Sequence, residues 1–218
     1  MKEQERRDFF CRIAPKYEQC VTNDCRYVAY QHVPHKVIKL LGANTAARVL
    51  DLGCGTGLGS IPFFKAGYEV TGIDDAQGML DIAKGKPFKK LICQNIEEDL
   101  HVADSTFDAA VSIGVMEFIR MPGAMIDQIA RKLKPGGIYS TTIPKPHPAG
   151  FSLGIRTYTI NNFLKFVDSE QFEIVDFLEC FGWESGHLAA ADGNPGQPRE
   201  GIEYSTLFLR KKNRQMVA

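Results

Sequence analysis

The sequence predicts an α/β protein with a Rossmann-like, seven-stranded and mostly parallel sheet whose last strand is antiparallel. Three observations predict this fold. Short apolar segments alternate with segments of helical periodicity, a glycine-rich turn follows the first apolar segment, and no helical segment separates the last two. We expect helices on both faces of the sheet and a helical segment at the N-terminus. A chain of 218 residues is long enough for one domain with a full core.

The predicted elements follow one another along the chain in a regular order. The first forty or so residues are expected to be helical, with breaks at Pro15 and near Asn23. Strands are expected at residues 48–51, 69–73, 90–93, 107–113, 138–143, 172–178 and 204–210. Helices are expected at residues 58–66, 76–84, 122–133 and 159–167. Residues 134–137 are expected to form a turn, and the Gly- and Pro-rich residues 144–154 and 182–201 are expected to form loops.

The charge balance excludes several classes of partner. Lys+Arg and Asp+Glu both number 26, so no basic excess favours nucleic acid or an anionic membrane. No segment is long enough to span a membrane, and no apolar run follows the charged residues 1–8, so we expect no signal peptide. The six cysteines are scattered and are read as reduced thiols, so we expect a cytoplasmic protein. We also expect a monomer or homodimer that binds neither nucleic acid nor membrane.

The strongest motif is Val-Leu-Asp-Leu-Gly-Cys-Gly-Thr-Gly at residues 49–57. A strand delivers Asp51, and then Gly53, Gly55 and Gly57 stand at every second position before a helix. Glycine permits a tight turn and lets a ligand approach the backbone. The N-terminus of the following helix offers unpaired N–H groups to that ligand.

The glycine spacing distinguishes between nucleotide-type ligands. A dinucleotide fingerprint requires its third glycine at the position occupied by Leu58, and no Gly-Lys-Ser/Thr ends the turn as a P-loop requires. The carboxylate of Asp51 repels a diphosphate and attracts a cationic ammonium group, directly or through water. S-adenosylmethionine (SAM) carries such an ammonium group and no phosphate.

Residues 49–57 resemble motif I of the class I SAM-dependent methyltransferases. Residues 72–80, 107–112 and 133–137 resemble the motifs of that family's second, fourth and fifth strands. Four motifs in order extend the resemblance through most of the chain. Ala14-Pro15-Lys16-Tyr17 is similar to a segment of the type 11 or Williams–Beuren-region-like branch. The resemblance implies SAM as the cofactor, S-adenosylhomocysteine as its product and methyl transfer as the reaction.

The resemblance also implies which residues bind the cofactor. The glycine turn contributes the residues Asp51, Gly53, Cys54, Gly55 and Gly57. Asp74 ends the second strand, where the family's acid takes both ribose hydroxyls, and Asp75 follows it. Both acids precede a helix and could instead cap it. Met79 would pack against the adenine, or it belongs to the core of an amphipathic helix.

Two further segments complete the implied cofactor site. Asn95 stands where the family has an Asp that meets the adenine amino group, and its amide oxygen can still accept that N–H. Ile96 would offer its backbone N–H to the adenine ring. Ile113 follows the fourth strand, in the segment that the family places beside the transferred methyl group.

The candidate catalytic residues are few. Glu117 could bind a substrate or serve the structure, and Phe118 replaces the His that often follows it in the family. Tyr17 could close over the sulfonium or pack the lid onto the sheet. His147 is a candidate base or substrate contact, or else a residue of a surface loop. No metal is expected, because the cysteines and histidines of residues 20–35 match no familiar zinc spacing.

The sequence thus predicts methyl transfer from SAM to a small-molecule acceptor by in-line displacement. The sulfonium methyl group is already activated, so the protein mainly aligns the acceptor and excludes water. The alternatives are a non-catalytic SAM-binding partner protein and an NAD(P)-dependent oxidoreductase. Residues 1–218 would form one domain, in which residues 1–45 are the lid, 46–145 the SAM-binding core and 146–218 the substrate-side half.

Overall fold

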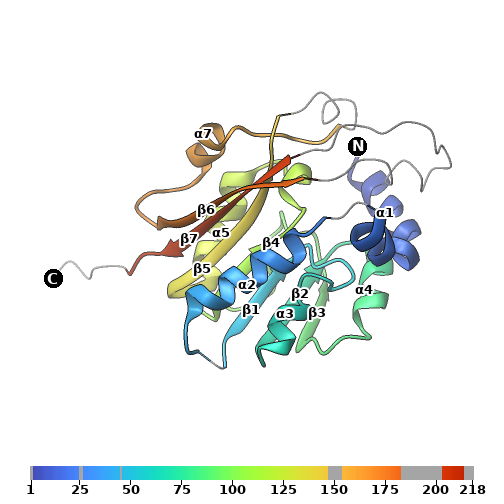
Figure 1. Cartoon of the computed structure of the whole chain (residues 1–218), viewed down its shortest axis with the longest axis horizontal. Coiled ribbons are helices and arrows are strands. Elements are labelled where there is room, and N and C mark those ends of the chain that lie inside the picture. Colours follow the sequence, from blue (N-terminus) through green and yellow to red (C-terminus); the bar gives the residue numbers. More distant parts are fainter. Residues whose placement is uncertain (1, 25–26, 45, 147–153, 183–202, 214–218) are drawn as a thin grey trace.

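A twisted sheet of seven strands forms the centre of the computed structural model, which describes residues 2–24, 27–44, 46–146, 154–182 and 203–213 (Figure 1). In the order in which they lie side by side, the strands are β3 (Lys90–Cys93), β2 (Glu69–Asp74), β1 (Arg48–Leu52), β4 (Phe107–Ser112), β5 (Leu133–Pro144), β7 (Glu203–Lys211) and β6 (Phe172–Gly182). The strand order reverses between β1 and β4, which is where open α/β sheets bind ligands.

The strand directions confirm the predicted fold class. Strands β1 to β5 pair in parallel, whereas β7 pairs antiparallel with both β5 and β6. No helix separates β6 from β7 among the described residues, as the sequence predicted for a hairpin. Because β7 runs antiparallel to β5, its first residues lie at the same sheet edge as the carboxyl end of β5, where Pro144 pairs with Tyr204.

Helices cover both faces of the sheet. On one face, α2 (Ala29–Leu41) and α3 (Ile61–Lys65) bury Val33, Val37 and Phe63 in one apolar cluster. On the other, α5 (Pro122–Lys132) and α7 (Ile160–Phe163), followed by the 3₁₀ turn Leu164–Phe166, pack into a second cluster. Side chains of a strand point alternately to its two faces, so each buried strand supplies both clusters.

Helix α1 (Glu3–Gln19) lies outside these two layers. It packs beside α4 (Gln77–Ala83), where Ile13 and Ala14 bury against Ala76 and Met79. A π-helical turn, Cys20–Asp24, follows it. Within the expected lid segment, α1 therefore stands apart from the sheet, whereas α2 belongs to a layer that covers the sheet.

The structure corrects three local predictions. Helix α1 continues through Pro15 without a break, because proline removes only one backbone donor and the packing against α4 holds both sides of it. The predicted helix at residues 58–66 begins only at Ile61, since residues 57–60 turn after the left-handed Gly57. Residues 134–137 form an irregular start of β5 rather than a separate turn, and the register with β4 shifts there.

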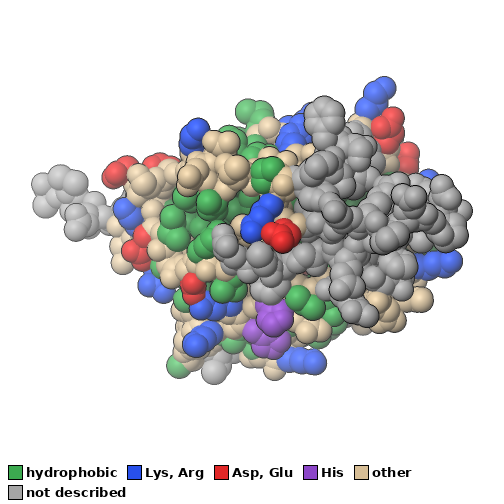
Figure 2. Space-filling model, turned by 45° about the horizontal axis from the view of Figure 1, so that its top comes forward, with side chains coloured by type: hydrophobic (Ala, Val, Ile, Leu, Met, Phe, Trp, Pro, Cys, Tyr) green, Lys and Arg blue, Asp and Glu red, His purple; other side chains and the backbone are tan. Residues whose placement is uncertain are grey.

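The surface agrees with the charge balance of the sequence. On the face shown in Figure 2, Lys and Arg side chains are interspersed with Asp and Glu side chains. Among the described residues, no helix is long and apolar enough to cross a membrane.

Candidate active site

The glycine-rich turn after β1 is held against the end of β2. The backbone N–H groups of Gly53 and Cys54 donate to the carbonyl oxygen of Ile73 at 2.8 and 3.0 Å, and Gly57 N–H donates to the carbonyl of Cys54 at 2.8 Å. Gly53, Gly55 and Gly57 have φ values of +67°, +53° and +84°, which glycine adopts without strain. The turn therefore needs all three glycines for its backbone path.

The free space at the position that a Cβ would occupy differs among the three glycines. A Cβ at Gly53 would lie 2.5 Å from Cγ2 of Val115, and one at Gly57 would lie 2.6 Å from a ring carbon of Phe88. A Cβ at Gly55 would meet only Cε1 of Tyr17, at 3.9 Å. From the sequence alone, these glycines are explained by the close approach of a ligand. That explanation fits Gly55, whereas neighbouring side chains crowd Gly53 and Gly57.

Asp51 and Cys54 lie beneath the turn. Asp51 is buried, and Ser60 Oγ donates to its Oδ2 at 2.5 Å. Burial raises the pKa of Asp51 to about 7, while the bond from Ser60 lowers it. A Cβ at Gly72 would stand 2.8 Å from the buried sulfur of Cys54. Neither residue lines the cleft described next, so their expected ligand contacts stay predictions.

Asp74 joins the turn to the end of β2. Its Oδ2 accepts from Gly55 N–H and its Oδ1 accepts from Ala76 N–H, both at 2.8 Å. Burial raises the pKa of Asp74 to about 6, against the two backbone hydrogen bonds, which lower it. The bond to Ala76 confirms that Asp74 meets the start of the next helical segment. The same carboxylate faces a cleft, where each oxygen keeps a second lone pair.

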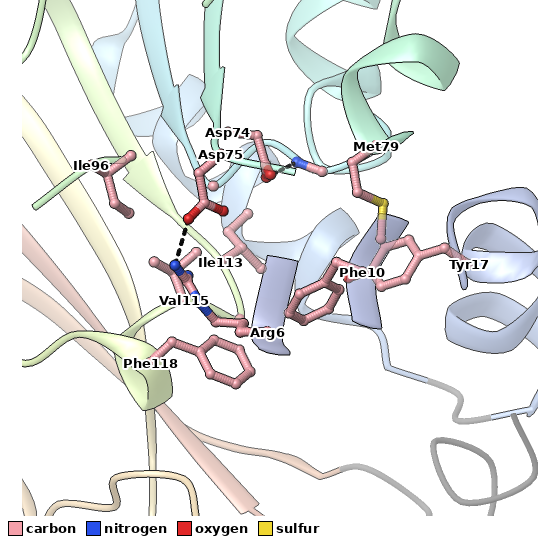
Figure 3. Close-up of a pocket in the computed structure, with 13 residues that line it drawn as sticks. Arg6, Phe10, Tyr17, Asp74, Asp75, Met79, Ile96, Ile113, Val115 and Phe118 are labelled. Carbon is pink, nitrogen blue, oxygen red and sulfur yellow. Dashed lines mark hydrogen bonds and ion pairs between the residues drawn. The ribbon is translucent and has the colours of Figure 1, made fainter. Parts of the chain in front are cut away.

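The cleft lies at the carboxyl edge of β1, β2 and β4, under α1 (Figure 3). Its polar residues are Asp74, Asp75 and Arg6, whose Nη2 donates to Asp75 Oδ2 at 2.5 Å. The remaining lining residues are Phe10, Tyr17, Gly53, Gly55, Met79, Ile96, Ile113, Gly114, Val115 and Phe118. The arrangement offers acids at one end and apolar walls around them, which suits a ligand with hydroxyl groups and an apolar ring.

Aromatic and cationic side chains of α1 cover this cleft. The ring of Phe10 lies edge-on to Phe118 at 5.6 Å and to Tyr17 at 6.4 Å. The Arg6 guanidinium lies 5.9 Å from the centre of the Phe118 ring. Tyr17 thus lines the cleft, and its expected contact with the sulfonium stays a prediction. Residues 6, 10 and 17 lie on one face of a helix, a signal by which the sequence could have identified Arg6 and Phe10.

Asn95 is engaged next to the cleft rather than in its lining. Its Nδ2 donates to Glu3 Oε1 at 3.1 Å, and its Oδ1 accepts from Glu97 N–H at 3.0 Å. The neighbouring Ile96 lines the cleft instead. The amide thus helps to hold the start of α1, and its expected contact with adenine stays a prediction.

Glu117 lies in the 3₁₀ turn Met116–Phe118 after β4 and is only 3% exposed. Tyr204 Oη donates to its Oε1 at 2.9 Å. Burial raises the pKa of Glu117 to about 7, against hydrogen bonds from its own backbone and from Tyr204, which lower it. Sequence reasoning did not identify Tyr204, because it stands 87 positions from Glu117 in the chain. His147, the third catalytic candidate, lies outside the described residues.

No three His, Cys, Asp or Glu side chains come together as metal ligands in the part of the chain that the structure describes. The titratable groups of the site are instead carboxylates and phenols. The site can therefore bind hydroxyl groups and exchange protons through its own side chains.

Comparisons with known proteins agree with this geometry. A family profile described as "Methyltransferase domain" matches residues 50–141. Demethylmenaquinone methyltransferase of Tropheryma whipplei (strain Twist) is 29% identical over 172 residues, which cover 76% of this chain and 71% of that protein. Ubiquinone biosynthesis O-methyltransferase of Xanthomonas oryzae pv. oryzae (strain PXO99A) is 34% identical over 115 residues, or 50% of this chain and 48% of that protein.

A solved structure extends the likeness of fold. The 1,6-didemethyltoxoflavin-N1-methyltransferase of Burkholderia thailandensis, solved with bound 1,6-didemethyltoxoflavin and S-adenosylhomocysteine, superposes with a TM-score of 0.67. The superposition covers 95% of this chain and 87% of that chain at 17% sequence identity. At this identity the likeness concerns the fold.

Proposed function

We propose that this chain, whose residues 50–141 match a methyltransferase domain, acts as a class I SAM-dependent methyltransferase: its cleft binds SAM and transfers the methyl group to a small-molecule acceptor. One observation carries the proposal. Asp74 and the glycine turn are joined by the hydrogen bond from Gly55 N–H to Asp74 Oδ2, at the edge of a cleft that is open above Gly55. An acid, an exposed loop backbone and apolar walls thus meet in one place.

The lining residues fit the parts of SAM. The carboxylate of Asp74 would accept the ribose hydroxyls, and Asp75 lies beside it. Met79 and Ile96 supply apolar surfaces for the adenine, and the open backbone at Gly55 would admit the amino-acid part. When bound, SAM supplies an electrophilic methyl group, so this chain's contribution is to hold the acceptor in line and exclude water.

Helix α1 would enclose the bound ligand. Phe10 and Tyr17 already cover the cleft, and Arg6 forms an ion pair with Asp75. Ligand entry would require this end of α1 to shift, because Arg6, which pairs with Asp75, and Phe10, which contacts Phe118, line the cleft from α1 (Figure 3). Once the ligand is in place, the same aromatic side chains would keep water from it.

The acceptor is proposed to be a small aromatic molecule of the quinone-precursor kind. The relative from Tropheryma whipplei is named a demethylmenaquinone methyltransferase, and the one from Xanthomonas oryzae is named a ubiquinone biosynthesis O-methyltransferase. The aromatic rings of Phe10, Tyr17 and Phe118 in the cleft suit such a molecule.

Calorimetry with SAM tests the proposal. The wild type should bind SAM, and Asp74→Ala should bind it about 10- to 100-fold more weakly, as expected for lost hydrogen bonds to a charged group. Asp81→Ala is the matched control, because Asp81 is 55% exposed on α4 and pairs with Lys84. If the wild type bound NADH but not SAM, or if Asp74→Ala bound SAM like the wild type, the proposal would be wrong.

A further inference from the structure

A buried carboxylate oxygen without a donor lies beside the cleft. Both oxygens of Glu117 are withdrawn from water, but only Oε1 has a partner, the hydroxyl of Tyr204. Glu117 Oε2 has no hydrogen-bond partner. Leaving such an oxygen unpaired in the interior is unfavourable, so an unpaired buried acceptor requires an explanation.

Gly114 connects this carboxylate to the cleft. Gly114 lines the cleft with φ of +69°, and a Cβ there would lie 3.9 Å from Tyr27 Oη and 4.0 Å from Glu117 Oε1. Its N–H donates to Thr142 Oγ1 at 2.7 Å, and Tyr27 Oη donates to the same oxygen at 3.4 Å. Because residue 114 has no side chain, only backbone stands between the cleft and the nearby Glu117 Oε1 and Tyr27 Oη.

The two tyrosines hold this arrangement in place. The Tyr27 and Tyr204 rings meet edge to face at 5.5 Å, and both residues are buried. They come from opposite ends of the chain, one just before α2 and one at the start of β7. Tyr204 fixes Oε1 of Glu117, while Oε2 has no donor, so the carboxylate keeps capacity for a further proton or hydrogen bond.

We propose that the Glu117 carboxylate takes the proton from a hydroxyl group of an aromatic acceptor, with Tyr204 and Tyr27 as positioning residues. This inference rests on the proposed function. The acceptor O–H bond breaks and its proton goes to the carboxylate, while the oxygen forms a bond to the methyl carbon. The carbon–sulfur bond breaks with its electron pair left on sulfur, so the charges of the sulfonium and the carboxylate both disappear. Glu117 then releases its proton to water.

The chemistry of the cluster favours a hydroxyl on an aromatic ring. A neutral amine already presents a lone pair, whereas a phenol is a poor nucleophile until its proton is removed, and a general base assists that step. The rings of Phe10, Tyr17 and Phe118, which line the cleft, provide aromatic surfaces for such an acceptor. The titratable groups that interact with Glu117 are Tyr27, Tyr158 and Tyr204, and burial raises the pKa of each. Of these facing groups, Glu117 is therefore the one that changes charge near neutral pH.

Two catechols of different acidity test the proton transfer. Transfer of radiolabelled methyl from SAM to catechol and to the more acidic 4-nitrocatechol would be followed between pH 5.5 and 8.5. Glu117→Gln should lower kcat/KM for catechol by about 100-fold, the usual contribution of a general base. With 4-nitrocatechol at pH 8, the kcat/KM of Glu117→Gln should stay within about threefold of the wild-type value, because that acceptor is already ionised. A purely structural role would slow both acceptors alike.

Binding gives a second readout that needs no turnover. Calorimetry with catechol and S-adenosylhomocysteine should show catechol affinity rising with pH through about 7 in the wild type, as Glu117 ionises and becomes the better acceptor. The affinity of Glu117→Gln should not change with pH. In the wild type, the hydrogen bond from Tyr204 lowers the pKa of Glu117. Tyr204→Phe removes this bond, so the pKa of Glu117 should rise and the acidic limb of the rate profile should move to higher pH.

Controls separate this inference from the proposed function. Glu173→Gln, which removes a 50% exposed carboxylate near the start of β6, should behave like the wild type in every assay. Failure to bind SAM overturns the proposed function. SAM binding without transfer to either catechol, or with pH-independent catechol affinity, overturns only this inference. If Glu117→Gln does not fold, Tyr204→Phe still tests the inference. A pH–rate profile whose acidic limb is the same in Tyr204→Phe as in the wild type would overturn it.

Discussion

The buried carboxyl of Glu117 should make folding stability depend on pH in a way that a single substitution removes. The folded state holds its pKa at about 7, whereas the ordinary value is 4.5. Between these values the folded protein keeps a proton that the unfolded chain has released. The group therefore stabilises the fold below about pH 4.5, and this contribution is lost as the pH rises through about 7.

The magnitude follows from the two pKa values. At about 1.4 kcal/mol per pKa unit, the difference between 4.5 and about 7 amounts to about 3.5 kcal/mol in the free energy of unfolding. About 2.5 kcal/mol of this falls between pH 5 and pH 8. Glu117→Gln cannot ionise, so the stability difference between variant and wild type should shift by that amount across the range, in favour of the variant at high pH.

Urea unfolding followed by far-UV circular dichroism measures this shift. The wild type, Glu117→Gln and the control Glu173→Gln would be unfolded at pH 5, 6, 7 and 8. Burial also raises the pKa of Asp51 and Asp74, so the wild type and the control should both lose stability as the pH rises. Only the difference between Glu117→Gln and the wild type isolates Glu117. If the difference in the free energy of unfolding between Glu117→Gln and the wild type stayed constant within about 0.5 kcal/mol from pH 5 to pH 8, the carboxyl would titrate normally, which would refute the reasoning.

Three other substitutions test the fold and the cleft. Gly57→Ala should cost about 1–2 kcal/mol in urea unfolding, because its φ is +84° and the new Cβ would lie 2.6 Å from the ring of Phe88; an unchanged midpoint would contradict this. Arg6→Ala frees an acid of the cleft, so calorimetry should show SAM binding several-fold tighter, and weaker binding would argue against an obstructing ion pair. Ile129→Ala should cost about 2–5 kcal/mol because Ile129 is fully buried, whereas Met121→Ala, at 66% exposure, should stay within about 0.5 kcal/mol.

The local pattern of the sequence predicted the layered sheet, the antiparallel last strand and the glycine turn. Alternation of apolar segments and the spacing of glycines are properties of neighbours in the chain, and the backbone geometry of strands and turns depends on those neighbours. For the same reason the sequence located Asp74 at the end of β2 and Tyr17 on a helix, which the structure places beside the cleft. The continuous helix through Pro15 was missed, because its support comes from α4, some sixty residues further along the chain.

The sequence by itself determined a methyltransferase-like α/β fold, with an acid and a glycine turn at the switch point of the sheet. Only the tertiary structure decided that Val115 and Phe88 crowd two of the glycines and that Ser60 binds Asp51 below the turn. It also decided that Tyr204 meets Glu117 across 87 positions of chain, leaving one carboxylate oxygen unpaired. Such contacts depend on how the strands are ordered in space, because burial and pairing follow from distances between segments that no local pattern encodes.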